Sequence, residues 1–173
     1  MAYTYQLIAS YKLTSTTASV TFGSIPQTYT DLEVRISARG DFADTNENVI
    51  ARLNGTSTAS YQNGQLSYYS SAINYNTSFN GTYFNNGPYI AGANLPANVF
   101  GMDSFYLPDY TNSTTYKAVK GFTALTKDTG TGWAVDWHGG LGNSAAVTSI
   151  TLAPYSGNYL SGSNFYLFGI KNS

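Results

Sequence analysis

The chain contains no cysteine, which excludes disulfides and thiolate metal sites as sources of stability. Charged residues are scarce as well: they make up 10% of the 173 residues, and the formal net charge is −1. The eight Lys and Arg are scattered along the chain and form no basic patch. Because nucleic acids and anionic membranes bind to a concentrated positive field, we expect neither among the partners of this chain.

Targeting segments are also missing from the sequence. No apolar run approaches membrane-spanning length, and Met1-Ala2-Tyr3-Thr4 lacks the positive region and apolar core of a signal peptide. We therefore expect synthesis in the cytoplasm. Ser, Thr and Asn together make up roughly a third of the chain, an excess typical of turn-rich β proteins and of extracellular or virion surfaces. This combination predicts a virion component released by lysis, with an intracellular bacterial protein as the alternative.

Apolar residues alternate with polar ones along most of the chain, which is the pattern of half-buried strands. No segment shows a helical period, a repeat or a linker. The pattern predicts a single all-β domain over residues 1–173, an antiparallel β-sandwich of the jelly-roll type with about eight to ten strands. The alternating runs cover residues 7–13, 18–22, 32–38, 49–53, 100–107, 116–125, 133–137, 147–153 and 164–171.

Individual runs predict pairings and faces. The first two runs could form a hairpin with each other. In the third run Glu33, Arg35 and Arg39 fall on the face opposite the apolar residues, toward solvent or a partner. In the run at 133–137, Trp133, Val135 and Trp137 share one face, and Asp136 and His138 lie on the other.

The segment from Asn54 to about Asn98 has a different character, being dominated by Asn, Gly, Ser and Tyr. Because it lacks the aliphatic content of a core strand, we expect long loops and short edge strands, which are often functional in a compact domain. Tyr provides a large amphipathic contact surface, and Asn, Ser and Gly adapt their hydrogen bonds to a partner. Alternatively, some of these aromatic side chains fill the ends of the sandwich. The candidate contact residues are Tyr68, Tyr69, Tyr75, Tyr83, Phe84 and Tyr89.

Candidate catalytic groups are few and unsupported by any motif. His138 with Asp136 would need a nucleophile and a third, orienting group, so a polar strand face is the favoured interpretation. An acid pair for glycoside hydrolysis could be sought among Asp103, Asp109, Asp128 and Asp136, yet sequence cannot place any two at the required separation. We therefore expect no enzyme activity, assign no catalytic residue and expect no cofactor.

Residues 41–47 gather acidic and amide side chains in one loop, and such oxygen-bearing groups are the ligands of calcium sites. The spacing does not fit an EF-hand, because no Gly marks the sharp turn and no distal Glu closes the loop. The favoured interpretation is a solvated turn whose side chains cap its own backbone, and no metal ligand is assigned.

Six segments near the two ends of the chain carry a resemblance to a known group of proteins: Leu7 to Ser10, Ala18 to Phe22, Ser24 to Leu32, Ser149 to Leu152, Asn158 to Ser163 and Tyr166 to Ile170. In these segments the chain resembles small virion proteins of tailed bacteriophages, particularly those of aquatic, cyanophage-like phages. In that group the final element usually reads Leu-Tyr-Gly-Ile, and Phe168 stands in place of the Tyr here. The resemblance covers roughly the first forty and last thirty residues and leaves the central Asn/Tyr-rich segment unmatched.

The resemblance implies a jelly-roll capsid decoration (cement) protein, often trimeric, or the terminal domain of a tail fibre. Because strands begin near Met1 and run almost to Ser173, no adaptor or shaft is expected, which favours decoration. The expected partners are the major capsid protein, on the outer surface of the head, and further copies of the chain. Loops such as Pro26 to Thr30, including Tyr29, and part of 54–98 would make the contacts. The alternative is a tail-tip module that binds host surface glycans; a glycan-cleaving depolymerase ranks third.

Overall fold

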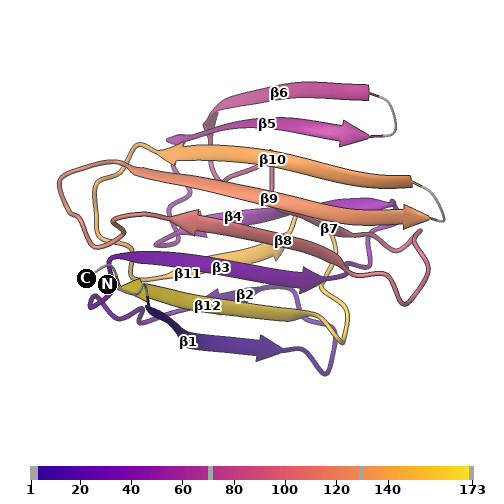
Figure 1. The fold of residues 1–173 in the computed structure, drawn as a ribbon, viewed down its shortest axis with the longest axis horizontal. Helices are drawn as coiled ribbons and strands as arrows, with labels where there is room; N and C mark the ends of the chain where they lie inside the picture. The colour runs from indigo at the N-terminus through magenta and orange to yellow at the C-terminus, as the bar shows by residue number, and fades with distance from the viewer. Residues whose placement is uncertain (1–3, 70–71, 129–130, 172–173) are drawn as a thin grey trace.

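The computed structural model describes residues 4–69, 72–128 and 131–171. In those ranges every regular element is one of twelve β-strands, and the named strands pair in the antiparallel sense. The strands form two sheets, one in front of the other in Figure 1. The all-β antiparallel sandwich expected from the sequence is confirmed, with more strands than predicted. Among the described residues no helix is long and apolar enough to cross a membrane.

The larger sheet contains eight strands and provides one whole face of the molecule (Figure 1). From one edge to the other its strands are β1 (Thr4–Lys12), β12 (Asn164–Lys171), β3 (Asp31–Ala38), β8 (Gly101–Leu107), β9 (Lys117–Asp128), β10 (Thr131–Leu141), β5 (Tyr61–Tyr69) and β6 (Ala72–Gly81).

The smaller sheet contains four strands and lies behind the larger one (Figure 1). Its order is β2 (Val20–Phe22), β11 (Ile150–Pro154), β4 (Asn46–Leu53) and β7 (Tyr89–Ala91). With half as many strands, this sheet packs against only part of the larger one.

The core lies between the two sheets and follows from the alternation of each strand. On β3, Leu32, Val34 and Ile36 are at most 2% exposed, while Arg35 between them points outward. On β10 the predicted apolar face holds, with Val135 and Trp137 buried and Trp133 half-buried. Each fully buried aliphatic or aromatic side chain stabilises the fold by about 1.5–3 kcal/mol relative to exposure.

The predicted N-terminal hairpin is wrong, because its two strands belong to different sheets. β1 pairs with β12 in the larger sheet, and β2 pairs with β11 in the smaller one. The segment between them crosses from sheet to sheet beside the Leu160 turn, where the Leu13 amide donates to the Ser163 carbonyl at 2.9 Å and the Thr17 amide to the Tyr159 carbonyl at 3.0 Å. Local alternation predicted both strands but could not identify their distant partners.

The prediction of long loops and short edge strands within 54–98 is also wrong in part. Residues 61–69 and 72–81 form the long strands β5 and β6. β5 has little aliphatic content because it buries polar side chains that hydrogen bond to residues after β6, namely Asn85 and Tyr89, the first residue of β7. The Asn63 side-chain amide donates to Asn85 at 3.0 Å, and Gln65 accepts the Tyr89 hydroxyl at 2.9 Å.

Arg39 is the third departure, since it was expected on the outward face and is only 6% exposed. Its guanidinium donates hydrogen bonds of 2.6 to 3.2 Å to four backbone carbonyls of the loop at 93–99. A planar guanidinium with five N–H donors can satisfy such a set of acceptors at once. The loop is therefore wrapped around a buried cation.

Candidate functional site

The outward face of the eight-stranded sheet, which we call the open face, is not covered by any strand that the structure describes, because the four-stranded sheet packs on the other face. Its residues are those that alternate with the core residues of each strand. On β8, Met102 and Tyr106 point outward, while Asp103, Phe105 and Leu107 are buried. The exposed large apolar residues of the open face are Tyr5, Leu7, Tyr68, Ile73, Tyr75, Phe79, Met102, Tyr106 and Phe122.

The open face is large and apolar for a surface exposed to water. Those nine side chains are between 37% and 68% exposed and come from five strands. Eight strands about 4.8 Å apart, each seven or more residues long, make a face of roughly 34 by 25 Å. Its area of about 850 Å² compares with the about 800 Å² that each partner buries in a standard protein interface. The nine exposed apolar side chains make this face a candidate interaction surface.

The charges on the open face are matched in sign. Arg35 donates to Glu33 at 2.6 Å, and Lys120 lies 3.8 Å from Asp136. The Arg35 guanidinium also lies over the Phe168 ring, 4.9 Å from its centroid. Surface pairs of this kind contribute little to stability, up to about 1 kcal/mol each. Their effect here is to leave the face without a dominant charge, which suits contact with an apolar or self-similar partner.

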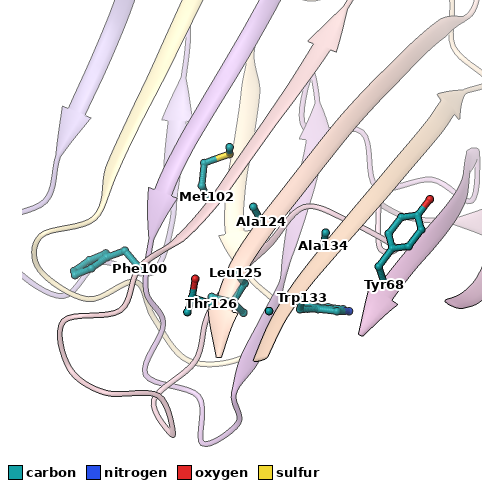
Figure 2. Close-up of a pocket in the computed structure, with 9 residues that line it drawn as sticks. Tyr68, Phe100, Met102, Ala124, Leu125, Thr126, Trp133 and Ala134 are labelled. Carbon is teal, nitrogen blue, oxygen red and sulfur yellow. The ribbon is translucent and has the colours of Figure 1, made fainter. Parts of the chain in front are cut away.

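Several grooves cross the open face. One of them, of about 580 Å³, lies across β8, β9, β10 and β5; Figure 2 shows Phe100 at one side of it and Tyr68 at the other. Its lining is Tyr68, Phe100, Met102, Ala124, Leu125, Thr126, Gly132, Trp133 and Ala134. A second groove of about 190 Å³ lies between β10 and β6, where His138 meets Tyr75 and Phe79. The grooves are therefore bordered by aromatic side chains.

Two of the predicted contact residues lie on the open face. Tyr68 is 38% exposed and stands across from Ala134 and Ile73 on the neighbouring strands. Tyr75 is 65% exposed and stands across from Leu66. Tyr69 is 42% exposed but points to the opposite side of β5 by alternation. The structure thus brings Tyr68 and Tyr75 into one surface and separates Tyr69 from them.

The prediction that Phe84 contacts a partner is wrong, because its side chain is 0% exposed. Its ring packs edge-on against Tyr61, with centroids 4.8 Å apart, and lies 6.3 Å from Trp137. Tyr89 is likewise held by the core: its ring packs edge-on against Trp133 at 4.5 Å, and burial raises the pKa of its hydroxyl to about 12. For these two residues the alternative, that aromatic side chains fill the sandwich, is correct.

Three further candidates lie away from the open face. Tyr83 is half-buried beneath Arg52, whose guanidinium is 5.4 Å from its centroid, and its ring is 6.3 Å from Tyr155. Pro26 is exposed, and its carbonyl accepts a hydrogen bond from the Tyr110 hydroxyl. Tyr29 is half-buried against Gly169, where any Cβ would overlap its ring. Both belong to the segment between β2 and β3, so the predicted set does not form one surface.

Sequence reasoning missed most of the open face, including Tyr5, Met102, Tyr106 and Phe122. A signal was present in the sequence of this strand. Phe105 and Leu107 fall on one of its faces, and Met102 and Tyr106 fall on the other, where polar residues are expected if that face meets only water. Apolar residues on both faces of a strand indicate that both faces are covered by something.

Of the acidic residues considered for glycoside hydrolysis, Asp103 is 0% exposed and lies beneath the open face. One carboxylate oxygen accepts hydrogen bonds from Trp137 Nε1 at 3.0 Å and from the Thr123 hydroxyl, and the other has no hydrogen-bond partner among the residues that the structure describes. Burial raises the pKa of Asp103 well above its ordinary value. Asp136 faces Lys120, and the side chain of Asp128 lies outside the described residues. Asp103 is therefore a structural group without access to a surface sugar.

The carboxylates of the loop at 41–47 hydrogen bond to backbone amides. Asp41 accepts from the Asn158 amide at 2.7 Å and from its side chain at 3.1 Å, and these bonds lower the pKa of Asp41. Asp44 accepts from the Thr45 amide at 2.6 Å. Glu47 is 2% exposed, and burial raises its pKa to about 7. No group of three or more His, Cys, Asp or Glu placed to hold a metal occurs in the described part of the chain.

Comparisons with known proteins leave the surface as the main guide to function. No protein-family model matches the chain, and no curated protein matches it. Among solved structures, the chain is similar to the galectin LEC-6 of Caenorhabditis elegans, with 9% sequence identity over 94% of this chain and 96% of that one. The TM-score is 0.33, and a likeness this weak carries no argument about what the chain binds.

Proposed function

We propose that the chain is a structural protein of a bacteriophage virion, a capsid decoration (cement) protein that docks on the major capsid protein lattice at the outside of the head. The observation that carries this proposal is the open face: a broad sheet surface with nine exposed large apolar side chains and with Arg35–Glu33 and Lys120–Asp136 ion pairs. The area of this face corresponds to that of a protein interface rather than of a single sugar. The resemblance of both chain ends to small phage virion proteins supports the same role.

The mechanism is mechanical and involves no catalysis. Each copy that covers the junction between capsid subunits binds the assembled lattice and not the separated subunits. By mass action it raises the free energy needed to break the shell. Copies that also contact one another bind with an avidity above that of one contact, so an interface of modest affinity is sufficient.

The proposal is tested by sedimenting the purified protein with undecorated heads of the phage that encodes it. We expect it to pellet with the heads at a saturating, lattice-like stoichiometry. Phe122→Glu on the open face should weaken binding by about tenfold or more, since it places a charge in an apolar interface. Tyr155→Glu, at an exposed tyrosine beside the smaller sheet, is the matched control and should bind as the wild type does. Loss of binding in the control alone, or no binding by the wild type, would overturn the proposal.

The second candidate is a tail-tip module that binds host surface glycans. It is favoured by the aromatic side chains that line the grooves, in particular Tyr68 at the 580 Å³ groove, because sugar rings stack on aromatic side chains. This candidate would be selected if the isolated protein binds host lipopolysaccharide, if Tyr68→Ala abolishes that binding, and if the protein does not bind to heads. Sustained release of reducing ends would instead indicate a depolymerase.

A further inference from the structure

The strand β6 has a free edge at the rim of the larger sheet. It is the last strand in the sheet order, and among the described residues it pairs only with β5 (Figure 1). An edge strand presents a row of backbone N–H and C=O groups, which is a template for pairing with another chain.

The other three sheet edges carry features that discourage pairing. β2 and β7 are three residues long each. β1 is longer, but a bulge between Leu7 and Ala9 breaks its register and Lys12 charges its end. β6 has ten residues with no charge and no proline, and its register with β5 is unbroken from Ala72 to Ser78. Bulges, shortness and charge are the usual protections of a sheet edge, and this stretch of β6 has none of them.

β6 is also exposed on both of its faces. Ile73 and Tyr75 are 68% and 65% exposed on the open face, and Asn74 and Asn76 are exposed on the other. β6 is therefore covered on neither face, whereas its neighbour β5 buries Tyr61, Asn63 and Gln65 on one face. A strand covered on neither face gains little from its own chain, so an additional partner strand would stabilise it appreciably.

The sequence of this stretch is symmetric in residue type about Tyr75. It reads Ala72-Ile73-Asn74-Tyr75-Asn76-Thr77-Ser78. Around the central tyrosine come an asparagine on each side, then a β-branched residue on each side, then a small residue on each side. An antiparallel pair of two such strands, related by a two-fold axis at Tyr75, places like types opposite each other with both open faces on the same side.

We propose that two copies of this chain pair through β6, antiparallel and centred on Tyr75, and so join their larger sheets into one continuous sheet. Ile73 of each copy then faces Thr77 of the other, and the two Tyr75 rings meet on the open face. The partner is a second copy because the strand is uncharged and its residue types read alike in both directions from Tyr75. This two-fold pair differs from the trimer that the resemblance implies, and it does not depend on the role at the capsid.

The first test is the mass of the purified protein in solution over a range of concentrations. The proposal expects a dimer, twice 18.6 kDa, that dissociates on dilution. Since the chain has no cysteine, a single introduced cysteine can form a disulfide only with the same cysteine of a second copy. Directly opposed residues have Cα atoms about 4.5–5.5 Å apart, within disulfide range, so Tyr75→Cys should form a disulfide-linked dimer on mild oxidation. Tyr5→Cys, at an exposed tyrosine on the opposite edge strand β1, is the control and should remain a monomer under denaturing conditions.

A charge exchange separates pairing from folding. Tyr75→Lys and Tyr75→Glu each place like charges directly opposite each other and should weaken the dimer, while a mixture of the two should dimerise about tenfold more tightly than either alone. Because Tyr75 is largely exposed, both variants should keep the wild-type circular dichroism spectrum. A wild-type protein that is monomeric at every concentration, a trimer, or a dimer that Tyr75→Lys leaves intact would each overturn the proposal.

Discussion

Replacing Glu47 with Gln is expected to remove a loss of stability that the wild-type protein undergoes as the pH rises. Glu47 lies on β4 and is 2% exposed. One carboxylate oxygen accepts the Ser156 amide at 3.0 Å, and hydrogen bonds from the Ser156 and Phe42 backbone act to lower the pKa of Glu47. Desolvation of the charged form dominates, and it raises the pKa of Glu47 from its ordinary 4.5 to about 7.

The magnitude follows from the difference between the folded and unfolded pKa. Between pH 4.5 and about 7 the folded state keeps the proton that the unfolded state has released, so the free energy of unfolding falls as the pH rises. A difference of about 2.5 pH units corresponds to about 3 kcal/mol. This contribution is fully present below the unfolded pKa and is lost as the pH rises through the folded one.

The assay is urea unfolding of both proteins, followed by tryptophan fluorescence, at intervals from about pH 4 to about pH 8. The difference in unfolding free energy between wild type and Glu47→Gln should shift by about 3 kcal/mol in favour of the variant as the pH rises. Other titrating groups are common to both proteins and cancel in that difference. A difference that stays constant across the range would refute the reasoning.

Four further outcomes follow from the same structure. Asp41→Asn should show the opposite trend to Glu47→Gln, costing more stability at neutral pH than in acid, because hydrogen bonds from Asn158 lower the pKa of Asp41; an equal cost at both pH values would contradict this. Arg39→Lys should lower the free energy of unfolding by about 1–3 kcal/mol, measured by urea unfolding, since one ammonium cannot reach four carbonyls. An unchanged free energy of unfolding would contradict the claim that the Arg39 guanidinium holds the loop at 93–99. Gly121→Ala should destabilise by about 1–3 kcal/mol and shift the fluorescence, because its Cβ would overlap the indole of Trp137. Phe84→Ala should lower the free energy of unfolding by about 3–5 kcal/mol because the side chain is buried. A variant as stable as the wild type would show that Phe84 is not a core residue.

The fold class was predictable because it depends on alternation, which is local. The strands at Leu32 to Ala38 and Trp133 to Trp137 have one apolar phase, and their inward faces are those expected. Strand partners were not predictable, since β1 pairs with β12 across almost the whole chain length. Nor was the burial of Arg39, because its carbonyl acceptors lie more than fifty residues away.

The site was predicted only in part, and the reason is physical. Tyr-rich composition identified Tyr68 and Tyr75 as surface residues but also selected Phe84, which is in the core. Composition does not record the phase of a strand, and the phase decides which of two neighbouring aromatic side chains faces water. The exposed apolar residues of the open face come from five strands that are distant in sequence, so only the sheet order brings Tyr5, Met102 and Phe122 into one surface.

The measurement that tests the central claim most directly is oxidative footprinting of the protein free and bound to undecorated heads. Met102, Tyr106 and Phe122 on the open face are at least 37% exposed, and Tyr155 beside the smaller sheet is 63% exposed, so all four react in the free protein. If the open face docks on the capsid lattice, binding should protect the first three and leave Tyr155 as reactive as before. Protection of Tyr155 with continued oxidation of Met102 and Phe122 would contradict the account.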